Sequence, residues 1–243
     1  MNDLERITKI LKDINAGDIL DIATGGGEFA YSLEASFKSF KTITGVDFNE
    51  RAIGSAREKF KEKENIFFEI QDATGLNYDD SSFDTVTISN SLHHFEDPFK
   101  VLSEMHRVLK KNGYLIISEM HSDPGQREEQ MTHVKLHHWW GEIDTLNGIV
   151  HNETFKSDDL FNIVNSLNLR DVKKFTYSFP SDGSDPKSKE TLDHLNKAID
   201  MYVARIHQSE KYSALINEAE EFRIRLNDIG FEPAGRVFIL GKK

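Results

Sequence analysis

Histidine side chains that could bind a proton or a metal ion gather in one part of the chain. Five of the ten histidines lie in this part: His121, His133, His137, His138 and His151. His133 and His137 are four residues apart, which places both rings on one face of a helix predicted at residues 127–146. Two imidazoles at this spacing suit a divalent metal ion, which His121 or His151 would complete. A neutral imidazole also suits a general base.

The same helix face extends beyond the two histidines. Trp140 and Asp144 follow His137 at further turns of the helix, while His138 and Glu142 form a second pair four residues apart. Asp144 would lie about 10 Å along the axis from His137, too far to share an ion, and we assign no metal. We predict a general base among His121, His137 and His138, with a structural role for the histidines as the alternative.

Two tryptophans, Trp139 and Trp140, lie on the same predicted helix. They either stack on a substrate or anchor the helix in the protein core, and the core role is favoured.

A glycine-rich turn supplies a second kind of chemistry. In "ILDIATGGGEFA", residues 19–30, an apolar run is followed by Gly25, Gly26 and Gly27 and then by a helical pattern. Glycines let the chain turn sharply and let a ligand touch the backbone, and the free N–H groups of a helix start attract an anion. The turn predicts a nucleotide-like ligand, although a tight turn without a ligand would need the same residues.

Two aspartates follow the next two predicted strands. Asp47 lies about 20 residues beyond the glycines, where a carboxylate can accept hydrogen bonds from both ribose hydroxyls of an adenosine group. Asp72 could accept a hydrogen bond from an adenine amino group, with Ala73 donating through its backbone. Solvated aspartates at strand ends are the alternative.

The elements that position these residues alternate between strands and helices. Apolar or β-branched runs predict strands at 17–23, 42–48, 65–71, 83–89 and 113–119, with helical patterns between them, the last of which runs over 97–111. This alternation is typical of an α/β fold with a doubly wound, largely parallel sheet, whose ligands bind at the carboxyl ends of the strands. Further on we predict helices at 127–146, 157–167, 190–208 and 210–229, strands at 172–179 and 235–242, and a loop at 180–190.

Composition narrows the class of protein. The 243 residues suffice for one large domain, and the net charge of −11 disfavours nucleic acid as a partner. There is no cysteine, which excludes thiolate nucleophiles and zinc–thiolate sites. The absence of a long apolar run and the charged start "MNDLERITKI" predict a cytoplasmic protein with no membrane partner. The negative charge favours a small molecule as the partner, and the helices predicted at 190–229 form a lid, a structural cap or the surface of a homodimer.

Four stretches in order resemble the class I S-adenosylmethionine-dependent methyltransferases, and within them the type 11 and ubiquinone/menaquinone-biosynthesis groups. They are "LDIATGGGEFA", "GVDFNE", "QDATGLNYDDSSFDTVTISNSLHHFEDP" and "EMHRVLKKNGYLIISE", which together cover about residues 15–120. Ala-Thr-Gly stands where the family commonly has Gly-Cys-Gly. The resemblance implies a Rossmann-like seven-stranded sheet whose last strand is antiparallel.

The resemblance also implies S-adenosyl-L-methionine as cofactor and S-adenosyl-L-homocysteine as product. Gly25 and Gly27 would border the methionine moiety, Asp47 would bind ribose, and Ser89 and Asn90 would lie under the sulfonium. The whole implied set is Ala23, Thr24, Gly25, Gly27, Asp47, Phe48, Asp72, Ala73, Ser89 and Asn90. His93 and His94 belong to the "LHH" element, for which a loop-shaping role is favoured.

We therefore expect residues 1–243 to form one methyltransferase domain, with a cofactor-binding core at 1–120 and acceptor-side helices at 121–168 and 181–230. The expected reaction is methyl transfer to a small-molecule acceptor. A catalytically silent S-adenosylmethionine-binding protein is the main alternative, because every motif serves cofactor binding. A nicotinamide dehydrogenase is a weaker alternative, because no tyrosine has a lysine four positions later.

Overall fold

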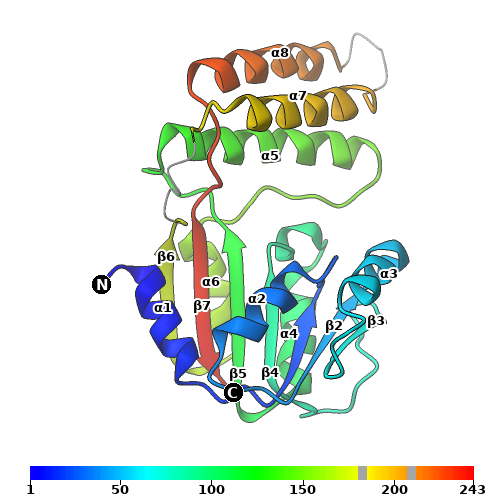
Figure 1. Cartoon of the computed structure of the whole chain (residues 1–243), viewed down its shortest axis with the longest axis vertical. Coiled ribbons are helices and arrows are strands. Elements are labelled where there is room, and N and C mark those ends of the chain that lie inside the picture. Colours follow the sequence, from blue (N-terminus) through cyan, green and yellow to red (C-terminus); the bar gives the residue numbers. More distant parts are fainter. Residues whose placement is uncertain (180–184, 207–211) are drawn as a thin grey trace.

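The computed structural model describes residues 1–179, 185–206 and 212–243. Its centre is one seven-stranded sheet with the strand order β3-β2-β1-β4-β5-β7-β6 (Figure 1). The strands are β1 (Asp18–Ile22), β2 (Thr42–Asp47), β3 (Ile66–Ile70), β4 (Phe83–Ser89), β5 (Leu109–Met120), β6 (Arg170–Tyr177) and β7 (Arg236–Lys242).

The pairing of the strands confirms the predicted sheet. β1 is parallel to both β2 and β4, and the parallel pairing extends outward to β3 and β5. β7 inserts between β5 and β6 and is antiparallel to both. The carboxyl ends of β1, β2, β3 and β4 therefore meet at one edge, where the predicted glycine turn and the acidic residues are located.

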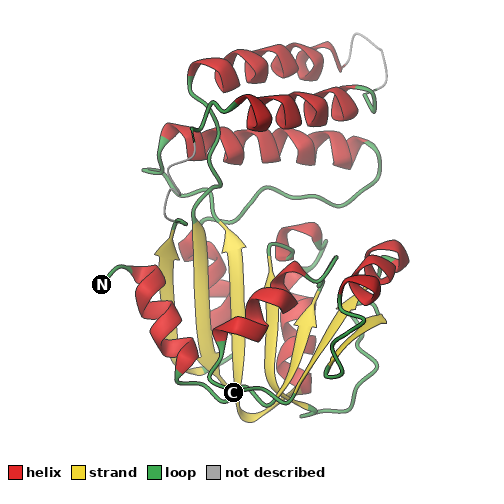
Figure 2. Ribbon diagram, in the orientation of Figure 1, coloured by secondary structure: helices red, strands yellow, loops and turns green. Residues whose placement is uncertain are grey.

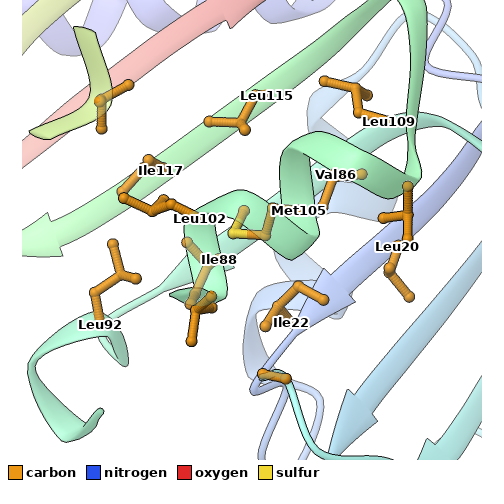
Figure 3. Packing of buried hydrophobic residues seen from close by; sticks show 14 of the residues in the cluster. Leu20, Ile22, Val86, Ile88, Leu92, Leu102, Met105, Leu109, Leu115 and Ile117 are labelled. Carbon is orange, nitrogen blue, oxygen red and sulfur yellow. The ribbon is translucent and has the colours of Figure 1, made fainter. Parts of the chain in front are cut away.

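Helices cover both faces of the sheet (Figure 2). Successive residues of a strand point to opposite faces, so Ile19 packs into one core and Leu20 into the other. The first core contains residues of α1 (Asp3–Lys12), α2 (Glu28–Ser36) and α3 (Glu50–Lys59), and the second contains residues of α4 (Pro98–Val108) and α6 (Ser157–Asn165). Figure 3 shows Leu102 and Met105 of α4 packed on this second face.

Three further helices stack beyond the carboxyl ends of the strands (Figure 1). We call α5 (Glu128–Leu146), α7 (Lys189–Val203) and α8 (Ser213–Asp228) the cap. Its own apolar core includes Leu136, Ile199 and Leu226. The cap thus lies over the edge of the sheet at which parallel α/β folds bind their ligands.

Some predicted boundaries were wrong, and α1 was not predicted. Asn2 caps α1 through its side chain, and Ile7 and Leu11 bury one face of this otherwise charged helix. The helix predicted to extend to residue 111 ends at Val108, because Leu109 adopts an extended conformation and pairs with Phe83. Parts of the loop predicted at 180–190 and of the two helices predicted at 190–208 and 210–229 lie outside the described residues.

None of the helices in the described part of the chain combines the length and the apolar character that a bilayer-crossing segment needs.

Candidate functional site

A cavity of about 350 Å³ opens at the carboxyl ends of β1 and β4. Five predicted cofactor residues line it: Ala23, Thr24, Gly25, Ser89 and Asn90. The remaining lining residues are Asp21, Glu28, Phe29, Ser32, Phe179 and Arg236. We call this space the cofactor cavity.

The glycines of the turn serve different purposes. Gly25 has a φ of +55°, and a Cβ atom placed there would meet no other atom within 4 Å, because it would project into open space. Gly27 has a φ of +83°, but a Cβ atom there would lie 2.8 Å from the ring of Phe60. Gly25 therefore leaves room at the cofactor cavity, whereas Gly27 permits close packing at the start of α2. No side chain caps α2, so its first N–H groups remain available to an anion.

Two residues that are not glycine adopt the left-handed backbone conformation in the cofactor cavity. Ala23 has a φ of 50° and Asn90 a φ of 47°. Asn90 is held there by its N–H, which donates to the carbonyl of Ser118, and by its side chain, which accepts from the N–H of Met120. Such strain persists only where neighbouring contacts enforce it, and it concentrates at binding sites.

Asp47 connects the glycine turn to the end of β2. One carboxylate oxygen accepts from the N–H of Gly25 at 3.0 Å and the other from the N–H of Asn49 at 2.9 Å. The carboxylate keeps further lone pairs for a ligand. Phe48, next to it, is 77 % exposed, which leaves a free aromatic face beside the turn.

Asp72 and Ala73 follow β3, which pairs with β2. Asp72 accepts hydrogen bonds from the backbone N–H and the hydroxyl of Thr74, and these bonds lower the pKa of the Asp72 carboxyl. Ala73 is buried. Asp47, Phe48, Asp72 and Ala73 lie outside the lining of the cofactor cavity, at the neighbouring strand ends.

Asp21 is a fully buried carboxyl below the turn. It accepts hydrogen bonds from the hydroxyls of Thr24 at 2.6 Å and Thr87 at 2.7 Å. Desolvation by burial nevertheless raises the pKa of Asp21 to about 6, because no cation compensates the charge and Asp47 repels it.

This raised pKa predicts a pH-dependent stability. The folded state binds the proton of Asp21 more tightly than the unfolded state, so the contribution of Asp21 to stability is full below pH 4 and is lost as the pH rises through about 6. Denaturant unfolding should show that the unfolding free energy falls by up to about 3 kcal/mol more over this range than in Asp21→Asn. Equal pH profiles of the two proteins would contradict a raised pKa.

Sequence reasoning missed six lining residues of the cofactor cavity, and two of them, Phe179 and Arg236, lie far from the glycine turn in the sequence. Arg236 begins β7, places its guanidinium over the ring of Phe179 at 5.4 Å and contacts the Ser89 hydroxyl at 3.5 Å. It brings a positive charge next to the strand ends. No local motif signals it, because the contact with Ser89 joins residues 147 positions apart.

Three imidazoles converge where the chain leaves the cofactor cavity and meets the cap. β4 leads through Asn90 into the short helix η1 (Leu92–His94), which carries His93. Nε2 of His137, on α5, lies 3.0 Å from Nε2 of His93 and 3.0 Å from Nε2 of His151. His94, whose ring lies beside His93 and His151, completes a set whose ligand atoms all fall within 4.8 Å of one another. We call His93, His94, His137 and His151 the histidine cluster.

A buried carboxylate stands behind each of two cluster members. Nδ1 of His93 lies 3.0 Å from Oε2 of Glu119, and Nδ1 of His151 lies 2.7 Å from Oδ2 of Asp144. Because a carboxylate accepts only, Nδ1 donates in both rings, which leaves Nε2 as the nitrogen that each ring directs toward His137. Burial lowers the pKa of His137 to about 2. His94 is an exposed residue, but loss of water around its ring, together with the neighbouring His93 and His151, lowers its pKa as well.

The structure separates the histidines that spacing had grouped. His133 is outside the histidine cluster: Nδ1 accepts from the N–H of Ala234, and burial lowers the His133 pKa to about 4. His138 accepts from the N–H of Thr154 and also contacts the Thr154 hydroxyl. His121 is buried, and its Nδ1 accepts from the N–H of Asp123. Burial lowers the pKa of both His121 and His138. The pKa of each of these three histidines therefore lies below the ordinary value of a histidine side chain.

The two tryptophans differ in environment. Trp139 is buried in the cap and its indole donates to the carbonyl of Leu215 at 3.0 Å, which confirms the core role. Trp140 stacks on Tyr202, and within the described residues its buried indole N–H has no hydrogen-bond partner.

A larger hollow of about 840 Å³ lies between α5 and α8. Its lining includes Glu142, Glu218 and Glu221 and shares no residue with the cofactor cavity. Its acidic lining and its separation from the glycine turn make it a poor site for the cofactor.

The sheet order, the glycine turn and the acidic strand ends have the arrangement of the class I S-adenosylmethionine-dependent methyltransferase fold. More specifically, residues 20–117 match the family model described as a methyltransferase domain. A curated relative from Bacteroides fragilis, named demethylmenaquinone methyltransferase, is 39 % identical over 113 residues, which are 45 % of this chain and 46 % of the relative. The chain thus spans about half the length of the curated relatives that it matches.

Solved structures share the whole fold at low identity. Phosphoethanolamine N-methyltransferase 2 of Haemonchus contortus, in complex with S-adenosyl-L-methionine, aligns with 98 % of this chain and 51 % of its own at 20 % identity and a TM-score of 0.59. The [4+2]-cyclase SpnF aligns with 98 % of this chain and 81 % of its own at 16 % identity and a TM-score of 0.55. These matches support the fold.

Proposed function

We propose that the protein transfers the methyl group of S-adenosylmethionine to a small-molecule acceptor bound under the cap. One observation carries this proposal: the residues that line the cofactor cavity at the end of β4, Ser89 and Asn90, lead within three positions into the histidine cluster. The cofactor cavity and a set of four imidazoles therefore adjoin one another. Methyl transfer needs an acceptor lone pair aligned behind the methyl group, and the space between core and cap would hold it there.

Each part of the cofactor has a proposed partner. The ribose hydroxyls would donate to Asp47, the adenine would lie between Phe48 and Asp72 with Ala73 donating to it, and Ala23, Thr24 and Gly25 would contact the methionine moiety. The carboxylate of that moiety would pair with the guanidinium of Arg236, which faces the same cavity. Gly27 would act indirectly, by letting α2 begin close to the ligand.

For the methyl acceptor we propose a chemical class, a small molecule, and no particular compound. The relative's name makes a demethylated quinone the first compound to test, but the matched residues 20–117 end before the cap, so the acceptor-side helices have no counterpart in that match. The net charge of −11 disfavours a nucleic acid acceptor.

Among the histidines predicted from sequence, we propose that His137 acts in turnover. It faces the histidine cluster, whereas His121 and His138 use ring nitrogens in hydrogen bonds to backbone N–H groups. His121 and His138 stay secondary candidates.

Release of S-adenosylhomocysteine tests the proposal. The protein is incubated with S-adenosylmethionine and either a demethylated quinone or a small-molecule metabolite extract. We expect it to release more S-adenosylhomocysteine than a sample without acceptor. A folded protein that binds S-adenosylhomocysteine but releases none with any extract would support the silent binding protein instead. The test is needed because the cyclase shares the fold.

Replacing Asp47 by alanine should weaken S-adenosylhomocysteine binding by about 2 kcal/mol or more, which is about 30-fold. The substitution removes charge-assisted hydrogen bonds to two ribose hydroxyls. Isothermal titration calorimetry measures the affinity.

Asp47→Asn provides the conservative comparison, because the amide oxygen can still accept from the N–H of Gly25 while the charge is lost. Asp193→Ala, an exposed residue of α7, is the control and should leave the affinity unchanged. Unchanged binding in a folded Asp47→Ala protein would remove Asp47 from the cofactor site.

A further inference from the structure

We propose that the histidine cluster is a binding site for a transition-metal dication such as Zn²⁺, with Nε2 of His93, His137 and His151 as ligands and His94 as the fourth. The sequence had assigned no metal, because it paired His137 with His133 on one helix. In the structure His137 instead meets two rings from other segments. This inference does not depend on the proposed methyl transfer.

The geometry of the histidine cluster carries the argument. Glu119 and Asp144 accept hydrogen bonds from Nδ1 of His93 and His151, so Nε2 of both rings lies toward His137. Nε2 of His137 lies 3.0 Å from each of them but has one in-plane position, which holds either one proton or one lone pair. Only one of the two neighbours can therefore form a straight hydrogen bond with this nitrogen, and the other is left with a bent, shared or unpaired contact.

Protonation does not remove this conflict. If His93 and His151 both became imidazolium ions, each would donate from Nε2, and the single lone pair of His137 could accept from one of them only. Two adjacent cations in a buried site would add repulsion. A metal ion accepts a lone pair from all three nitrogens at once, which a single proton on Nε2 of His137 cannot do with straight hydrogen bonds.

The separations between the nitrogens suit such an ion. Zn²⁺ binds imidazole nitrogen at about 2.0–2.1 Å, and tetrahedral ligands at this distance are about 3.3 Å apart. The two Nε2–Nε2 distances of 3.0 Å are close to this value, and the four ligand atoms fall within 4.8 Å. A hydrogen bond to the backbone of Val150 orients the ring of the exposed His94.

The surroundings match the second layer of a metal site. Metal-bound histidines usually donate their other N–H to a carboxylate, which orients the ring and raises its basicity. Glu119 is itself held by the N–H groups of Ser91 and Leu92, at 2.7 and 3.0 Å, and Asp144 pairs with Arg205 at 2.6 Å. Both carboxylates are buried, and with the Arg205 guanidinium they leave one negative charge, which would offset part of the charge of a dication.

The ligand set selects the class of metal. Imidazole nitrogen suits Zn²⁺, Cu²⁺, Ni²⁺ and Fe²⁺, whereas Mg²⁺ and Ca²⁺ require oxygen ligands. The ion would also join the core to the cap, because His93 and His94 belong to η1, His137 belongs to α5, and His151 belongs to the segment that follows α5.

Metal titration of the full chain tests the proposal without an activity assay. After dialysis against a chelator and its removal, calorimetry should show one equivalent of Zn²⁺ bound, while Mg²⁺ should give no heat. Co²⁺ should produce the intense visible absorption of a tetrahedral nitrogen site. Bound Zn²⁺ should also raise the temperature of thermal unfolding.

Variants then locate the site. His137→Ala and His151→Ala should abolish the one-equivalent binding, and Asp144→Asn should weaken it by about 10–100-fold. His94→Ala removes an exposed ring, so the fold should persist while the Co²⁺ spectrum changes. His194→Ala on α7 and His133→Ala on α5, both outside the histidine cluster, are the controls and should bind Zn²⁺ like the original protein.

The absence of Zn²⁺ binding by the folded original protein would overturn the proposal. So would Zn²⁺ binding that survives in His137→Ala and His151→Ala, or that is lost equally in His194→Ala. If His137→Ala fails to fold, the Co²⁺ spectrum of His94→Ala tests the proposal instead. A spectrum identical to that of the original protein would then overturn it.

Discussion

Valine in place of Gly25 should weaken S-adenosylhomocysteine binding by more than about 10²-fold in a protein that still folds. The Cβ atom at this position meets nothing within 4 Å, so the branched side chain enters the cofactor cavity without disturbing the core. The φ of +55° adds strain of about 1–2 kcal/mol, which a domain of this size can tolerate. Calorimetry measures the affinity, and circular dichroism during heating measures the fold.

Valine substitutions at two other glycines serve as controls, because they distinguish the effect of backbone strain from the effect of filling the cofactor cavity. Gly125 has a φ of +90° and equally open surroundings but does not line the cofactor cavity, so Gly125→Val should carry similar strain and keep its affinity. Gly27→Val should lose stability instead, because its Cβ would lie 2.8 Å from the Phe60 ring and 3.1 Å from the Phe68 ring. Retained affinity in Gly25→Val would show that Gly25 serves the turn alone.

The centre of the sheet could be predicted from sequence because strands such as β1 and β7 are buried on both faces. Ile19, Leu20 and Ile22 all enter a core, and such continuous apolar runs are readable without knowledge of their partners. α1 was missed because charged residues surround its two buried positions, Ile7 and Leu11. Ile7 and Leu11 become buried only because α1 packs on one face of the sheet, and the local sequence does not show this contact.

The cofactor residues could be predicted because they follow strand ends in short motifs. Gly25 and Asp47, which bond to each other, each sit directly after or at the end of a strand that the sequence reveals. The histidine cluster had no such signal. Its link between His93 and His137 spans 44 positions, and it forms because the cap folds back over η1. Helical spacing correctly placed His133 and His137 on one face, but it could not show which elements that face meets.

Replacing His137 by alanine should lower the rate of methyl transfer by about 10²-fold or more while S-adenosylhomocysteine affinity stays unchanged. His137 stands at the centre of the histidine cluster, outside the cofactor cavity that Gly25 and Asn90 line. Its loss removes either a general base or a metal ligand next to the acceptor. The product-release assay measures the rate, with His121→Ala and His138→Ala in parallel because both were candidates from sequence.

A chelator distinguishes the two roles of His137. Burial that lowers the His137 pKa to about 2 makes this imidazole a weak base near neutral pH, so its effect on rate should come through a bound metal. The original protein should then lose activity in chelator and regain it with Zn²⁺, whereas His137→Ala should respond to neither.

Two other outcomes would contradict a role for the metal. Activity that resists the chelator but falls in one alanine variant would identify that histidine as the base. If His121→Ala, His137→Ala and His138→Ala all keep full activity in chelator, neither a base nor a metal takes part, and the rate enhancement comes from holding the acceptor in line with the methyl group.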